Sequence, residues 1–188
     1  MKNVEKVCSD VWKIKADSNL YIIIREEPFI IDTGRKENKY ILQDCVTKII
    51  DPKKIKKVIF SHLHYDHIGN FDFFPNAEYF ASKIEIEDFK TSPNATILNP
   101  AMVKMFSANL SQLTDFDDFI VIPTPGHTRG SVSIWYPQKK VLFSGDTLFF
   151  NNATGRVDLP TSSPKEMNSS LILLKNLDYA ILCPGHEY

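Results

Sequence analysis

The placement of its histidines constrains this chain more than any other sequence feature. There are five in 188 residues, and three of them, His62, His64 and His67, share one short segment with Asp66 in the pattern His-x-His-x-Asp-His. The segment directly follows the apolar run 57–60, which predicts a short buried strand. Alternate positions of an extended chain face the same way. We therefore expect His62 and His64 to face one point, and Asp66 and His67, past the turn, to face a second point beside it.

Three further ligand-type side chains each follow a predicted strand and stand directly after a glycine. They are His127 in TPGHTRG, Asp146 in LFSGDTLF and His186 in ILCPGHEY. Rigid scaffolds commonly place sites in loops at sheet ends. A single histidine in such a position is more often structural, but here three strand ends carry all five histidines and a fourth carries Asp146. The pattern predicts that these side chains meet at one site.

The residue types at these positions favour metal binding. Imidazole and carboxylate are the usual ligands of zinc and related divalent metals. A structural zinc site is usually closed by four ligands and rich in cysteine. Seven nitrogen and oxygen donors without a nearby cysteine pair instead predict two metals with open coordination positions.

Apolar periodicity predicts strands in two groups, each accompanied by helices. Predicted strands cover residues 11–15, 20–25, 28–33, 57–60, 78–81, 119–124, 131–136, 141–144 and 180–183. Predicted helices cover residues 38–50, 83–90, 101–113 and 164–174. This order predicts a layered α/β protein with two packed sheets, and the absence of linkers and repeats predicts one domain over residues 1–188.

The segment 91–118 is the least regular part of the chain. On a helix over 101–113, Met102, Met105 and Phe106 would lie on one side. Two interpretations stay open for these three side chains. They either belong to the core or line a lid that contacts substrate.

Composition excludes several classes of partner. The formal net charge is -1, with 22 basic and 23 acidic residues, whereas a nucleic-acid binder usually has a basic excess. No stretch is apolar enough to span a membrane, and the first ten residues lack the apolar core of an export signal. The three cysteines are far apart, which is typical of a reducing cytoplasm. We expect a cytoplasmic protein that acts on a small molecule, without a nucleic-acid or membrane partner. The oligomeric state is left open.

Five motifs together resemble the metallo-β-lactamase superfamily. They are IIDTG (30–34), SHLHYDHIGN (61–70), TPGHTRGS (124–131), SGDTLF (144–149) and CPGHEY (183–188). They run in the family's order and cover nearly the whole chain. The resemblance implies a four-layer αββα sandwich with the metals at one edge of the two sheets.

The resemblance also implies a role for each candidate ligand. The first metal would be held by His62, His64 and His127, the second by Asp66, His67 and His186, and Asp146 would bridge them. Asp32 of the IDTG turn would orient the ligand loop without binding metal. The implied cofactors are two divalent ions, above all zinc, with iron or manganese as alternatives. The implied reaction is hydrolysis by a hydroxide shared between the metals, and Asp66 could steer that hydroxide as a catalytic residue.

Within the superfamily the chain resembles the glyoxalase II-like branch. GDTLFFNNATGRVDLP is similar to that branch's GDTLF…GR.DL stretch, with Arg156 and Asp158 on the GR.DL positions, and the ending GHEY is also similar. This implies a hydrolase of thioesters or esters such as hydroxyacyl-glutathione. Glyoxalase II continues past its last histidine into a helical domain that helps to bind glutathione. The sequence up to Tyr188 holds no counterpart of that domain, so glutathione dependence stays open.

Other activities on the same fold are alternatives. Persulfide dioxygenase shares the motif order but uses one iron, which His62, His127 and Asp146 could hold as a facial triad. A nuclease of the ribonuclease Z type, or a lactonase, is less favoured. For a nuclease the neutral charge and short length argue against the assignment. Metal identity would separate the hydrolase from the dioxygenase.

Overall fold

A mixed seven-stranded sheet is formed by the first half of the chain. In the computed structural model, which describes residues 3–187, this sheet has the order β1-β2-β3-β4-β5-β6-β7. The strands up to β4 are antiparallel, whereas β4 to β7 run parallel. Their bounds are β1 Val4–Lys6, β2 Val11–Ile14, β3 Leu20–Ile23, β4 Phe29–Ile31, β5 Lys57–Ile59, β6 Glu78–Ala81 and β7 Leu110–Gln112.

A four-stranded sheet from the second half faces the first one. Its order is β11-β10-β9-β8, with β10 and β11 parallel and the other neighbours antiparallel. The strands are β8 Ile120–Pro123, β9 Val132–Tyr136, β10 Val141–Gly145 and β11 Ile181–Pro184.

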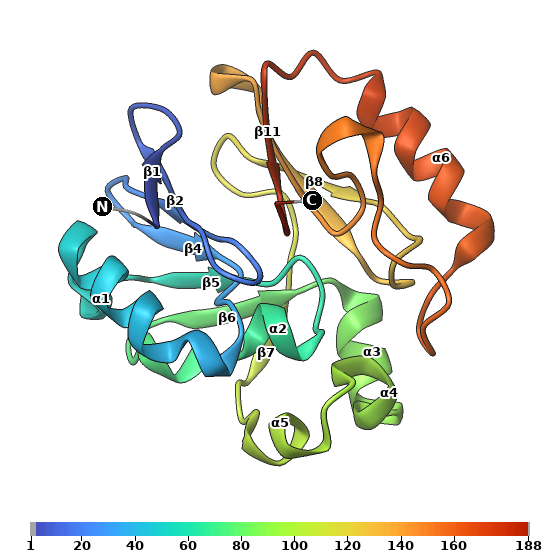
Figure 1. Cartoon of the computed structure of the whole chain (residues 1–188), viewed down its shortest axis with the longest axis horizontal. Coiled ribbons are helices and arrows are strands. Elements are labelled where there is room, and N and C mark those ends of the chain that lie inside the picture. Colours follow the sequence, from blue (N-terminus) through green and yellow to red (C-terminus); the bar gives the residue numbers. More distant parts are fainter. Residues whose placement is uncertain (1–2, 188) are drawn as a thin grey trace.

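Helices cover the outer face of each sheet, as Figure 1 shows. The first five accompany the large sheet: α1 Lys39–Ile49, α2 Tyr65–Ile68, α3 Lys83–Thr91, α4 Pro93–Ile97 and α5 Pro100–Met105. The sixth, α6 Pro164–Lys175, lies outside the small sheet. Short 3-10 turns occur at Lys36–Asn38, Pro52–Lys54, Phe71–Phe73, Pro137–Lys139 and Phe150–Asn152. None of the helices in residues 3–187 is long and apolar enough to cross a membrane.

Strand alternation divides the interior into separate cores. Ile22 and Ile30 pack between the large sheet and its helices, whereas Ile23 and Ile31, one position along, pack between the two sheets. Successive side chains of a strand point to opposite faces, so a strand buried on both faces is apolar throughout. A third core, which includes Leu174, joins the small sheet to α6. Three cores separate four layers, so the expected αββα sandwich is confirmed.

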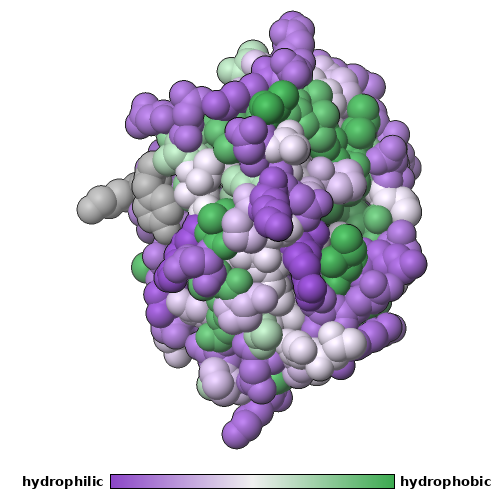
Figure 2. Space-filling view, turned by 90° about the vertical axis from the view of Figure 1, so that its right-hand side faces the viewer, coloured by the Kyte–Doolittle hydropathy of each residue, from purple (hydrophilic) through white to green (hydrophobic). Residues whose placement is uncertain are grey.

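On the small-sheet side of the molecule, the surface carries both hydrophilic and apolar side chains. Figure 2 shows the side of the molecule that carries α6, where hydrophilic surface surrounds separate apolar groups. Ile172 and Leu173 of α6 are about half exposed. Scattered apolar side chains of this kind are ordinary on protein surfaces.

The prediction of one helix over residues 101–113 is wrong. The α5 helix ends at Met105, and β7 then joins the large sheet as a parallel partner of β6. Phe106 leaves the helical conformation and packs into the core with Met102, whereas Met105 is 49% exposed. The core interpretation therefore holds for Met102 and Phe106 but not for Met105, and none of the three side chains lines the pocket described below.

Candidate metal centre

The candidate ligands come from strand ends that meet at one edge of the sandwich. Each cluster of ligand-type residues follows the carboxyl end of β5, β8, β10 or β11 within a few residues. In the large sheet β5 runs parallel to β4, and in the small sheet β8, β10 and β11 share one direction. Their ends therefore point to a common edge between the layers, as the sequence predicts.

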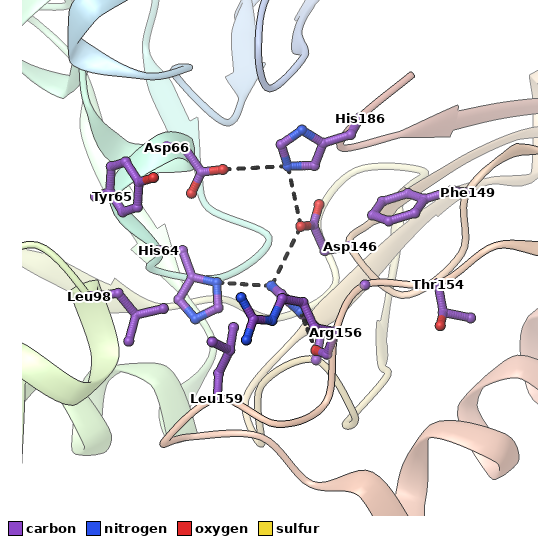
Figure 3. A pocket seen from close by; sticks show the side chains of 12 residues that line it. His64, Tyr65, Asp66, Leu98, Asp146, Phe149, Thr154, Arg156, Leu159 and His186 are labelled. Carbon is purple, nitrogen blue, oxygen red and sulfur yellow. Dashed lines mark hydrogen bonds and ion pairs between the residues drawn. The ribbon is translucent and has the colours of Figure 1, made fainter. Parts of the chain in front are cut away.

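The fold brings all seven candidate ligands together. Among residues 3–187 three groups place their ligand atoms within 4.8 Å of one another: His62, His64 and His127; His62, His67 and Asp146; and Asp66, His67 and His186. The first and third groups match the two sets that the resemblance implies. Asp146 lies between them, and Figure 3 shows it facing His186, which in turn faces Asp66.

The spacing of the donor atoms suits divalent metals. The Nε2 atom of His186 lies 3.4 Å from Asp66 Oδ2 and 3.3 Å from Asp146 Oδ2. Asp146 also lies 3.4 Å from His67 Nε2 and 3.5 Å from His127 Nε2. Bonds of 2.0–2.1 Å in tetrahedral geometry put ligand atoms about 3.4 Å apart. The observed separations therefore match donors that share a metal ion.

Outer hydrogen bonds fix the orientation of most of the rings. The Nδ1 atom of His67 lies 2.8 Å from Asp32 Oδ2, that of His127 lies 2.8 Å from the Arg156 carbonyl, and that of His186 lies 2.6 Å from the Asp17 carbonyl. Such partners select the tautomer and leave Nε2 as the electron-pair donor. Asp32 also accepts bonds from the backbone amide and hydroxyl of Ser61, so it holds the beginning and the end of the ligand segment 61–67 together.

Several buried polar atoms in this edge lack a protein partner. His62 Nε2, His64 Nε2 and Asp146 Oδ1 make no hydrogen bond within the described chain. Buried polar groups are rarely left unsatisfied unless an ion, water or function accounts for them. Metal coordination accounts for His62 and Asp146 directly, because their orphaned atoms belong to the donor groups above. The site therefore fits the implied metals.

Electrostatics place most of the donors in a metal-binding protonation state. Burial and the neighbouring histidines lower the pKa of His62 well below its usual value, and burial also lowers the pKa of His64 to about 3. Although burial opposes it, the charges of His67 and His186 lower the pKa of Asp66 to about 2. Burial alone would lower the pKa of His186, but Asp146 and Asp66 raise it to about 9. Metal binding at the group containing His186 must therefore displace a proton.

A cleft of about 270 Å³ opens onto the metal-facing side chains. Five of the seven candidate ligands border it, together with residues that the metal site does not use. These are Tyr65, Leu98, Phe149, Thr154, Gly155, Arg156 and Leu159. Leu98, at the end of α4, is the contribution of segment 91–118 to the pocket, and the sequence pattern did not single it out.

Glycine at position 185 permits the close approach of two ligand loops. A Cβ built on Gly185 would lie 2.1 Å from Asp146 Oδ1 and 2.9 Å from His67 Cε1. Any other residue would push the turn that carries His186 away from the cluster. The glycine that precedes His186 in the sequence is thus required by packing against the site.

Most of the chain matches one family model. Residues 16–186 match the model of the Metallo-beta-lactamase superfamily, and the chain belongs to it. Probable metallo-hydrolase MJ0888 of Methanocaldococcus jannaschii is 32% identical, over 90% of this chain and 87% of its own length. Hydroxyacylglutathione hydrolase of Bartonella tribocorum is 30% identical over 70% of this chain and 48% of its own length, so the chain spans about half of that relative.

Solved structures share the fold. The protein TTHA1623, described in a di-iron-bound form, superposes with a TM-score of 0.71 at 24% identity and covers 94% of this chain and 91% of its own. DIM-1 metallo-beta-lactamase gives a TM-score of 0.74 at 18% identity over 98% of this chain and 89% of its own. Family, fold and the His/Asp cluster support a metal-dependent hydrolase with a candidate site for divalent metals.

Proposed function

We propose that this chain is a binuclear metallohydrolase that cleaves small thioesters or esters of the hydroxyacyl-glutathione type. The observation that carries the proposal is the convergence of seven nitrogen and oxygen donors in two groups with Asp146 between them, five of which border one pocket. We assign His62, His64 and His127 to one metal and His67, Asp66 and His186 to the other. Bound zinc ions would supply a nucleophile near neutral pH and polarise the scissile carbonyl.

The remaining pocket residues would bind and orient the substrate. Tyr65, Leu98, Phe149 and Leu159 give the cleft apolar walls suited to a short acyl chain. Asp66 borders the same cleft as an ionised carboxylate, so it can orient an attacking water by accepting a hydrogen bond from it.

Arg156 gives the pocket rim a positive charge. Its guanidinium is held by Asp158 through two bonds of 2.9 Å, and both side chains are about two-thirds exposed. An arginine in this position suits a carboxylate on the substrate. This supports an anionic thioester over a neutral one. Arg156→Ala should raise KM for anionic substrates and leave KM for neutral esters unchanged.

The deciding experiment measures metal content and substrate range on the same preparation. Protein purified without added metal should carry about two equivalents of zinc, or a mixed pair, by mass spectrometry. It should then release free thiol from hydroxyacyl thioesters, with esters and lactones as comparison substrates. One equivalent of iron together with oxygen uptake on glutathione persulfide would replace the proposal with the dioxygenase.

A further inference from the structure

One buried carboxylate outside the ligand set touches both loops of the first ligand group. Glu85, on the first turn of α3, is fully buried. Its Oε2 accepts the backbone N–H of Leu63 at 2.9 Å, and its Oε1 accepts the hydroxyl of Thr128 at 2.5 Å. Leu63 stands between His62 and His64, and Thr128 directly follows His127. A single side chain therefore links the loop after β5 to the loop after β8.

The loop after β8 is seated closely on the start of α3. Ser82 donates its hydroxyl to the Gly130 carbonyl at 2.6 Å, and a Cβ on Gly130 would lie 2.6 Å from the Glu85 nitrogen. One turn further along the helix, Asp88 pairs with Arg129 at 2.6 Å. Several contacts thus hold this loop to α3, but within residues 3–187 only Glu85 of α3 also hydrogen-bonds to the loop after β5.

Burying the Glu85 carboxylate costs free energy, and a residue that only filled space in the core would not carry that cost. No ion pair joins its carboxylate to a cation in the described part of the chain, and burial of an unpaired carboxylate is unfavourable. Burial raises the pKa of Glu85 to about 7, although the bonds from Thr128 and Leu63 oppose that rise. An apolar residue would fill the volume but would leave the buried Leu63 N–H without its acceptor and the Thr128 hydroxyl with Ser131 alone as a partner. Both donors belong to loops that carry candidate ligands.

We propose that Glu85 is a positioning residue that fixes His62, His64 and His127 as one metal-binding group. The inference rests on the proposed metal site, and it concerns how tightly that site holds its ion. Residues that orient metal ligands from outside typically contribute 10–100-fold to metal affinity. By setting the two loops against each other, Glu85 keeps the three imidazoles at the separation that one ion requires.

The test follows metal release from the holoprotein, without reference to substrate. Wild type, Glu85→Ala, Glu85→Gln and Asp88→Ala are dialysed against a graded series of chelator, and retained metal is counted by mass spectrometry. Asp88→Ala is the matched control, because it removes a contact of the same helix with the same loop. Thermal unfolding of the metal-free proteins shows whether each variant folds.

The expected result is selective loss from one site. Glu85→Ala should release one equivalent at about 10–100-fold lower chelator activity while the second equivalent follows wild type. Glu85→Gln keeps the shape, and its amide can accept from Leu63 and donate to the Thr128 hydroxyl, so it should stay within about threefold of wild type. Asp88→Ala should follow wild type for both equivalents.

Three results would overturn the proposal: Glu85→Ala with wild-type release, loss of both equivalents together, or an equal shift in Asp88→Ala. If Glu85→Ala does not fold, Thr128→Val removes one of the two bonds and should still shift the same equivalent, whereas no shift rejects the proposal. If wild type holds a single metal, the binuclear function fails, but the Glu85 shift is then read on that ion, since His62 and His127 serve in either arrangement.

Discussion

The two candidate ligand groups are anchored by different kinds of structure. The group of His62, His64 and His127 lies on loops that a fully buried carboxylate, Glu85, ties to α3. The loop that carries His186, the member of the other group that lies outside the loop after β5, is anchored instead by the N-terminal hairpin of β2 and β3. The Asn19 amide and the Tyr21 hydroxyl both donate to the Pro184 carbonyl, at 2.9 and 2.7 Å.

The second anchor also includes an ion pair near the surface. Glu187, directly after His186, accepts from Lys13 and from Asn19. Its side chain is 38% exposed, whereas that of Lys13 is 6% exposed. The two anchors share no residue, and among the candidate ligands Asp146 lies against both groups. The loop that carries His186 can therefore be weakened without touching the Glu85 contacts, whereas a change at Asp146 affects both groups.

The strongest perturbation should therefore be Asp146→Ala. It removes the carboxylate that faces His67, His127 and His186, so we expect both metals and hydrolytic activity to be lost together, with a rate reduction of about a thousandfold or more. Metal content and thiol release measure this, with the exposed surface substitution Asp178→Ala as control. Two retained metals with normal turnover would contradict the bridging role.

Substitutions within one group should remove one metal and spare the other. His64→Ala and His186→Ala each delete a donor from a different group, so each variant should retain about one equivalent under chelation that leaves wild type with two. Both should lose most activity, because the proposed reaction uses both ions. If either variant lost both equivalents, the two groups would not be independent sites.

Local sequence patterns predicted the elements whose core contacts are set by their own periodicity. The strand at 78–81 and the hairpin of β3 and β4 occur as expected, and the seven candidate ligands converge because each follows a strand end. The pattern failed at 101–113, because β7 exists only through pairing with β6, thirty residues earlier. Such pairing has no local signal.

Glu85 was missed for a related reason. An acidic residue in the first turn of a helix is ordinary on sequence grounds, since it favours the helix dipole. Its burial depends on Thr128 and Gly130 folding over α3, more than forty residues later. Outer partners of metal ligands are therefore harder to predict than the ligands, whose residue types and spacing are visible in the sequence.

Smaller and unequal losses of stability should follow substitution of the two lysines that approach the Glu187 carboxylate. Lys13 is buried and bonds Glu187, whereas Lys15, just after β2, is 41% exposed at its side chain and lies 3.6 Å away. Lys13→Ala should destabilise the fold by about 1–3 kcal/mol and loosen the metal of the His186 group. Lys15→Ala should change stability by less than about 1 kcal/mol. Denaturant unfolding and chelator release test this, and equal effects would contradict the proposed anchor.

Glu85 and Glu187 should differ in how their contributions to stability depend on pH, because the two contributions change in opposite directions. The pKa of Glu85, raised by burial to about 7 from 4.5, means that the folded state binds the proton more tightly than the unfolded state. That stability is fully present below about pH 4.5 and is lost as pH rises through about 7. The opposite holds for Glu187: burial works against it, but Lys13 and Asn19 lower its pKa, so its contribution is present at higher pH and is lost as pH falls.

Relative to metal-free wild type, the stabilities of metal-free Glu85→Gln and Glu187→Gln should therefore change with pH in opposite directions. Between pH 5 and 8 the stability of Glu85→Gln relative to wild type should rise with pH, by at most about 3 kcal/mol, because the neutral amide avoids burying a charge. The stability of Glu187→Gln relative to wild type should be lowest at high pH, where wild type has its full ion pair, and should approach wild type in acid. Denaturant unfolding between pH 5 and 8 measures the first difference. The second is measured below pH 4.5, the ordinary pKa of a glutamate, where the lowered pKa of Glu187 makes its contribution disappear. If the free energy of unfolding of Glu85→Gln ran parallel to that of wild type across the range measured for the first difference, the buried carboxylate would be ionised without cost. The contrast between the buried Glu85 and the partly exposed Glu187 would then rest on hydrogen bonding alone.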